Sequence, residues 1–372
     1  MSIGNPKRDK ALALLEREKL EGLIVFSNGT CSILRPSYLH YFAGVRPLGP
    51  RNAAVVSKAG DGVLLVEPLW DALRVSRKSW IKEVRGTEDF EGDLLDILDR
   101  FGIKGPLGIA GSVDMTYDLY GRIEKRFQII PADFIIEEMA REKTPGEIEL
   151  VKKTARIADI GFQAFLDHAR VGTREYELAA EMEYAMRRAG ADDVFILLSS
   201  GPHNFEMHEP RDRRLETGDV VIGEITPVCE GQFFQLCRTV ILGSASPLQN
   251  EKYTLLIEAL NRTLEETRAG IAASVISKTM NRVITDGGYG KYCYAPYMRA
   301  RGHGFGVGSI APGAVIDDDN HNLLEKNQLV VIHPNQWLPE TGYLACGESY
   351  LIADEGCEKL SQTETRLYEN KG

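Results

Sequence analysis

Three polar side chains stand inside a stretch that otherwise has the pattern of a plain β-hairpin, residues 218–243. Runs of valine, isoleucine and leucine towards both ends favour buried strands. A purely structural hairpin does not need the carboxylate of Glu224, the amide of Gln235 or the guanidinium of Arg238 between those runs. The hairpin is therefore the stretch around which we expect a functional site to be organised.

This hairpin resembles the metal-site hairpin of the creatinase/aminopeptidase P/prolidase family, the pita-bread enzymes of peptidase family M24. In that family one Asp stands at the position of Glu224, and a second Asp follows eleven residues later. The spacing is kept here, but the second Asp is Gln235 and the T-R-T-like run that follows begins with Cys237. The chain has the frame of the family with altered ligands.

Four further residues carry the resemblance through residues 208–348, and with the Y-L-x-x-F-x-G-like segment at residues 38–44 it covers nearly the whole chain. His208 takes the place of a family histidine about ten residues before a Gly-Asp pair. His303 lies in a G-H-G-F-G run, whose glycines let the backbone approach a ligand or metal closely. His333 precedes a proline where the family has a ligand Glu, and Glu348 takes the position of the last, bridging ligand.

The altered ligand set predicts a site unlike the dinuclear one of the family. The peptidases hold two divalent ions with four carboxylates and one imidazole, and the ions activate a bridging water. The corresponding positions here are Glu224, Gln235, His303, His333 and Glu348. Two carboxylates carry half the negative charge of four, so we expect either no metal or one divalent ion.

In our first interpretation, the protein is a creatinase-like hydrolase of a C–N bond in a small polar substrate and uses no metal. His208 or His303 would act as general acid or base, while Glu224 or Glu348 would orient the imidazole or bind a cationic group. This chemistry needs a histidine that titrates near neutral pH, which a neighbouring carboxylate can provide.

Two other interpretations stay open. In one, a single ion binds His303, His333 and a carboxylate from Glu224 or Glu348, and the protein is a metal-dependent hydrolase or lyase. In the other, the chain is a non-catalytic binding module of the same fold, although the grouping of titratable residues argues against it. Plain aminopeptidase or prolidase activity is not expected from the broken ligand set.

Three residues are expected to contact the substrate: Arg51, Gln235 and Cys237. The resemblance implies that an arginine at the position of Arg51 reaches the site of a dimer partner and holds a carboxylate, which suits a planar guanidinium. Solvation at the surface is the alternative for Arg51. A nucleophilic Cys237 beside His208 is less favoured than packing, because buried cysteines are mostly inert.

The order of elements predicts an α+β protein with two domains. Strands alternate with helices in the first third, which indicates a smaller creatinase-like α/β N-terminal domain over residues 1–138. A pita-bread catalytic domain is expected over residues 139–372. Its first helix is predicted to start at Thr144-Pro145 and to reach about His168.

Composition limits the partners. The 372 residues carry a net charge of −10, which argues against nucleic acid and anionic membranes. No apolar run is long enough to span a bilayer, and the first residues lack the apolar segment of a signal peptide. Six scattered cysteines fit free thiols. We therefore expect a cytoplasmic enzyme for a small molecule, and the resemblance implies a homodimer.

Overall fold

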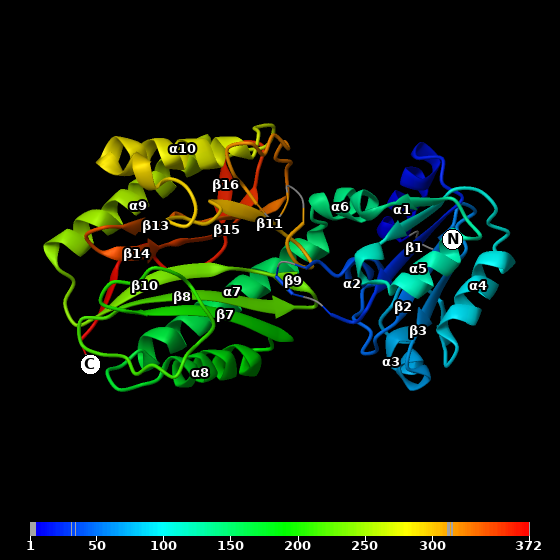
Figure 1. Cartoon of the computed structure of the whole chain (residues 1–372), viewed down its shortest axis with the longest axis horizontal. Helices are drawn as coiled ribbons and strands as arrows, with labels where there is room; N and C mark the ends of the chain where they lie inside the picture. The colour runs from blue at the N-terminus through cyan, green and yellow to red at the C-terminus, as the bar shows by residue number, and fades with distance from the viewer. Residues whose placement is uncertain (1–4, 31, 34, 311–312, 314, 372) are drawn as a thin grey trace. The chain divides into compact units, whose positions relative to one another are not determined.

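The computed structural model describes residues 5–30, 32–33, 35–310, 313 and 315–371. The chain divides into two compact units, which are considered separately (Figure 1). One unit comprises Met1–Arg141 with Gly306–Gly308, and the other comprises Glu142–Phe305 with Ser309–Gly372. Among the described residues, none of the helices combines the length and the apolar character needed to cross a membrane.

The N-terminal unit is built on a six-stranded sheet with the order β4-β3-β2-β1-β5-β6. Its strands are β1 (Gly22–Ser27), β2 (Asn52–Ser57), β3 (Gly62–Val66), β4 (Glu83–Gly86), β5 (Leu107–Ala110) and β6 (Ile129–Pro131). Its helices are α1 (Pro6–Arg17), α2 (Tyr38–Ala43), α3 (Ala72–Ser76), α4 (Phe90–Arg100), α5 (Tyr117–Glu124) and α6 (Asp133–Arg141). The sheet contains both parallel and antiparallel strand pairs, and helices alternate with the strands along the chain. The predicted α/β organisation of this unit is therefore confirmed.

The C-terminal unit is built on a nine-stranded sheet whose main order is β11-β12-β15-β10-β8-β7, with a separate hairpin β13-β14. Its strands are β7 (Asp193–Gly201), β8 (Val220–Cys229), β9 (Gln232–Phe233), β10 (Leu236–Leu242), β11 (Gly302–Phe305), β12 (Leu329–Ile332), β13 (Asn335–Leu338), β14 (Gly342–Ala345), β15 (Gly347–Ile352), β16 (Cys357–Lys359) and β17 (Tyr368–Asn370). Its long helices are α7 (Pro145–His168), α8 (Glu175–Arg188), α9 (Pro247–Glu266) and α10 (Ser274–Ile284).

Local sequence explains where α7 begins. Thr144 accepts a hydrogen bond from the backbone N–H of Glu147, and the Glu147 carboxylate accepts one from the backbone N–H of Thr144. This capping box, with a proline at the first helical position, satisfies backbone donors that the helix leaves unpaired. The predicted helix is confirmed with the bounds Pro145–His168.

Helix α7 distinguishes the two faces of β8 and β10. A methyl group at Gly223 would lie 3.1 Å from the ring of Phe165 in α7, and one at Gly161 in α7 would lie 3.1 Å from Ile225. Gly223 and Ile225 therefore point towards α7, and Glu224 between them points to the opposite face. We call these the α7 face and the site face; Figure 1 shows α7 and α8 beside β7, β8 and β10.

Candidate functional site

Five of the predicted residues lie on the site face: Glu224, Gln235, His303, His333 and Cys237, which is paired with Glu224. Gln235 Oε1 lies 3.0 Å from His303 Nε2, and the rings of His303 and His333 lie 5.9 Å apart between centroids. Glu224 reaches this face from β8, because it alternates with Gly223 and Ile225. The fold thus brings together residues that are far apart in the sequence. Glu224 comes from β8, His303 from β11, His333 from the end of β12 and Gln235 from the position just before β10.

His303 is held as a neutral ring. Its Nδ1 lies 3.2 Å from the carbonyl oxygen of Gly304 and 3.3 Å from the Ser309 hydroxyl, and its Nε2 lies 3.0 Å from Gln235 Oε1. Burial, with the guanidinium of Arg299, lowers the pKa of His303 to about 4. The expectation of a histidine with a pKa near neutral pH is not met at His303, because burial disfavours its charged form and the nearby charge is a cation rather than a carboxylate.

His333 follows the same pattern. Its Nδ1 lies 3.0 Å from the Asn335 amide nitrogen, which donates to it. Burial lowers the pKa of His333 well below its usual value, and the positive charge of Arg299 adds to this effect. Both imidazoles are therefore uncharged at neutral pH.

Arg299 was not identified from the sequence, although it is the cation that pairs with Glu224 in the site. Its Nη2 donates to the Glu224 carboxylate, and its backbone N–H donates to Asn335 Oδ1 at 2.7 Å. The Glu224 side chain is 5% exposed and the Arg299 side chain 40%. A count of charges around Glu224 would have called for a counter-ion, but nothing in the sequence distinguishes Arg299 from the neighbouring Arg301.

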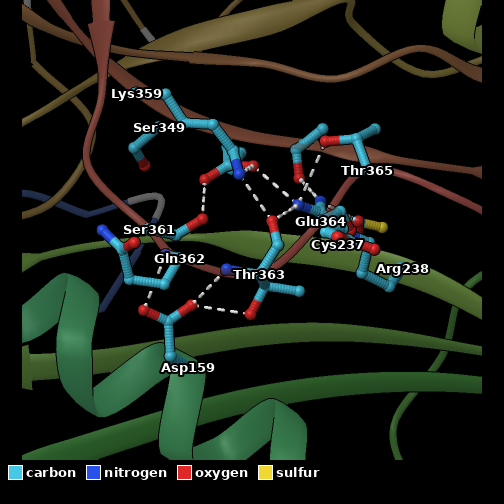
Figure 2. Close-up of polar contacts among 12 residues, drawn as sticks. Asp159, Cys237, Arg238, Ser349, Lys359, Ser361, Gln362, Thr363, Glu364 and Thr365 are labelled. Carbon is cyan, nitrogen blue, oxygen red and sulfur yellow. Dashed lines mark hydrogen bonds and ion pairs between the residues drawn. The ribbon is translucent and has the colours of Figure 1, made fainter.

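Glu348 does not join this group, which corrects the expected ligand set. It is paired with Leu236, which is itself paired with Ile225, so Glu348 lies on the α7 face. There Arg238 Nη2 donates to its carboxylate at 2.6 Å, and the Ser361 hydroxyl donates to the other oxygen (Figure 2). The side chains of Arg238 and Glu348 are both fully buried.

At position 347, where β15 presents a residue to the site face opposite Cys237, the residue is a glycine. Gly347 is paired with Cys237, which is paired with Glu224. A methyl group at Gly347 would lie 2.3 Å from the carbonyl oxygen of Ile332, and its φ is +108°. No side chain fits there without a backbone change.

His208 also lies away from the group. Its backbone forms a bridge with Leu198, which pairs with Gly223, so His208 lies on the α7 face. Its Nδ1 lies 2.8 Å from the carbonyl oxygen of Glu209 and 3.7 Å from the carboxylate of Glu175. The structure therefore separates His208 from His303, which corrects the expected grouping of these titratable residues in one site.

Cys237 lies on the site face, so the nucleophile interpretation beside His208 has no geometry to support it. Burial raises the pKa of the Cys237 thiol, with the negative charge of Glu224 adding to the effect. Cys229, Cys237, Cys293, Cys346 and Cys357 are free thiols, and Cys31 lies outside the described residues.

Arg51 belongs to the N-terminal unit, where it already has a carboxylate partner. Its Nε and Nη2 donate to the two oxygens of Glu67 at 2.7 and 2.8 Å. The pair is partly exposed. A role of Arg51 at a substrate carboxylate stays a prediction that would require Glu67 to share the guanidinium.

The residues present do not fit a metal ion. On the site face the only predicted ligand with a negative charge is Glu224, and Arg299 neutralises it. A divalent cation would meet two neutral imidazoles, an amide and a guanidinium that repels it. In the described part of the chain, no three His, Cys, Asp or Glu side chains are grouped to hold an ion.

Comparisons with known proteins agree with the motifs. Residues 149–355 match the model of metallopeptidase family M24, and residues 7–141 match that of the creatinase/prolidase N-terminal domain. The chain is 28% identical to an Xaa-Pro dipeptidase of Pyrococcus furiosus, over 94% of this chain and 99% of that protein.

Solved structures agree in fold. The X-Pro aminopeptidase from Thermotoga maritima MSB8 is similar with a TM-score of 0.86 at 22% identity, over 97% of this chain and 99% of that one. The prolidase from Pyrococcus furiosus is similar with a TM-score of 0.81 at 25% identity, over 95% and 99% of the two chains.

Proposed function

Because this chain belongs to metallopeptidase family M24, a family of hydrolytic enzymes, we propose that it hydrolyses a C–N bond. We propose further that its substrate is small and polar and that the reaction does not use the metal centre of the family. The names of the relatives, Xaa-Pro dipeptidase and X-Pro aminopeptidase, support the reaction class. The ligands on the site face support the departure from metal chemistry.

One observation carries the proposal: the Arg299 guanidinium is bound to Glu224, the single predicted carboxylate on the site face. The positive charge of the site then comes from the chain itself. Beside it, His303 and His333 are in the basic form at neutral pH. Either imidazole could take a proton from an attacking water and return it to the leaving nitrogen.

The experiment combines metal content with turnover. Chelator-treated full-length protein is assayed with amidino and N-methyl amino acids, and with Xaa-Pro dipeptides for comparison. We expect C–N cleavage in the first class that does not change on adding Mn²⁺ or Zn²⁺, and a loss of about 100-fold or more in His303→Asn. His168→Asn, which changes a half-exposed histidine on α7, is the matched control.

Two outcomes would contradict the proposal. Two ions per chain together with dipeptide cleavage would indicate an ordinary metallopeptidase. A His303→Asn variant with unchanged turnover would remove His303 from the chemistry.

The expected alternative of a non-catalytic binding module does not agree with the match to a family of hydrolytic enzymes and with the Xaa-Pro dipeptidase relative.

A further inference from the structure

We propose that Arg299 binds the carboxylate of a ligand that enters the site, so that the substrates are small carboxylic acids. The inference rests on the proposed function only in identifying the ligand as a substrate. Binding itself does not require turnover, so the two can be tested separately.

The first argument is the state of the guanidinium. Arg238 and Arg301 in the same unit are fully buried, and backbone carbonyls and side-chain acceptors take up their donors. Arg299 differs because two-fifths of its side chain is exposed while Nη2 stays on Glu224. Since a guanidinium presents five N–H donors in a planar fork, a second carboxylate can approach while Glu224 fixes the plane.

The second argument is charge. The Glu224 carboxylate is the charged group that Arg299 contacts, and it balances a single positive charge. A cationic ligand would have to compete with Arg299 for Glu224. An anionic ligand keeps that pair intact and gains charge-assisted hydrogen bonds, which are about twice as strong as neutral ones.

The third argument is an aromatic cluster, defined as Phe205, Tyr292, Tyr294, Tyr297 and Trp337. Tyr297 and Trp337 have ring centroids 5.3 Å apart, and Phe205 and Tyr294 are about half exposed. The cluster joins the site through β13, where Asn335 and Trp337 share a face and Asn335 Oδ1 accepts from the Arg299 backbone. Flat apolar surface close to the arginine suits a ligand whose carboxylate is attached to a planar or apolar body.

The test compares benzoate with benzamide, which has the same shape but no charge. Isothermal titration calorimetry on the full-length, chelator-treated protein should give benzoate a dissociation constant at least about tenfold lower than that of benzamide. Arg299→Gln should abolish this preference, and Arg299→Lys should keep only part of it. Arg282→Gln, which changes an exposed arginine paired with Glu266, should leave the preference unchanged.

The wild-type ratio alone can overturn the proposal. If benzoate and benzamide bind within about threefold of each other, or neither binds, Arg299 does not recognise carboxylates, whether or not the variants fold. A preference that persists in folded Arg299→Gln has the same consequence. Benzoate has no scissile C–N bond, so a preference without any hydrolysis would uphold the inference and count against the proposed function.

Discussion

Two arginine–glutamate pairs lie on opposite faces of neighbouring strands, and they differ in how much water reaches them. Arg238 and Glu348, on the α7 face, are fully buried. Arg238 also donates to the carbonyl oxygens of Cys237, Gly347, Thr363 and Glu364 and to the Thr365 hydroxyl (Figure 2). Arg299 on the site face stays 40% exposed beside a buried Glu224.

The difference separates a structural ion pair from one that is available to a ligand. The segment 363–365, whose oxygens accept from Arg238, is also held by α7. The carboxylate of Asp159 in α7 accepts hydrogen bonds from the backbone N–H groups of Gln362 and Thr363 (Figure 2). Removal of one partner from such a saturated, buried pair leaves an uncompensated charge. A pair with one exposed partner loses less when that partner is removed, because water can take its place.

Glu348→Ala should therefore give the largest effect, a loss of about 3–5 kcal/mol in the free energy of unfolding, because Arg238 would be left charged and buried. Denaturant unfolding of the full-length protein measures it. Glu358→Ala, an exposed glutamate on β16, is the control and should change stability by less than about 0.5 kcal/mol. A Glu348→Ala loss below about 1 kcal/mol would mean that the buried pair is not structural.

Gly347→Ala should cost about 2–3 kcal/mol, because the new methyl group meets the Ile332 carbonyl oxygen in a left-handed backbone. The same change at Gly146, near the start of α7, has open space around it and should be neutral or slightly stabilising. Equal stabilities of the two variants would refute the steric argument that position 347 cannot carry a side chain.

The free energy of unfolding should fall on acidification because of His303. Its pKa is about 4 in the folded chain against 6.5 as the ordinary value, so the unfolded chain binds the proton first. His303 therefore costs little stability above about pH 7 and about 2.5 kcal/mol at pH 4.5. His303→Gln should flatten the fall between pH 6.5 and pH 4.5, whereas His168→Gln should not. If the pH dependence of the free energy of unfolding were the same in His303→Gln as in the wild type, the His303 ring would be exposed to water rather than buried.

Arg299→Gln should have the smallest effect on folding, a loss of about 1 kcal/mol, since water can reach Glu224 through the half-exposed position. Arg238→Gln serves as the comparison and should lose several times as much. If the two losses were equal in denaturant unfolding, the distinction between the faces would disappear.

The sequence predicted the family, the pita-bread fold and a hydrolytic enzyme, and the matches to family models and relatives confirm all three. Local signals sufficed for the elements: the cap at Thr144 marks α7, and β-branched runs mark β8 and β10. The cytoplasmic location, the homodimer and the role of Arg51 stay predictions.

The site was predicted only in part, because side-chain direction in a strand changes with every residue. Glu348 matches a motif, but its register with Leu236 turns it to the α7 face and leaves Gly347 on the other. His208 is turned away in the same manner by its bridge to Leu198. Arg299 meets Glu224 only through tertiary structure, because the two are 75 positions apart in the sequence.

The backbone at Gly347 also has a consequence for how this chain can evolve. An acidic residue there would face both a positive φ and a carbonyl oxygen 2.3 Å from its first side-chain atom. A single substitution of Gly347 by an acidic residue would therefore strain the backbone and would not place a usable metal ligand in the site. The neighbouring strands would have to shift before a carboxylate could be accommodated at this position. Evolution towards a carboxylate-rich metal centre is therefore hindered, whereas the positive charge of Arg299 is already in place.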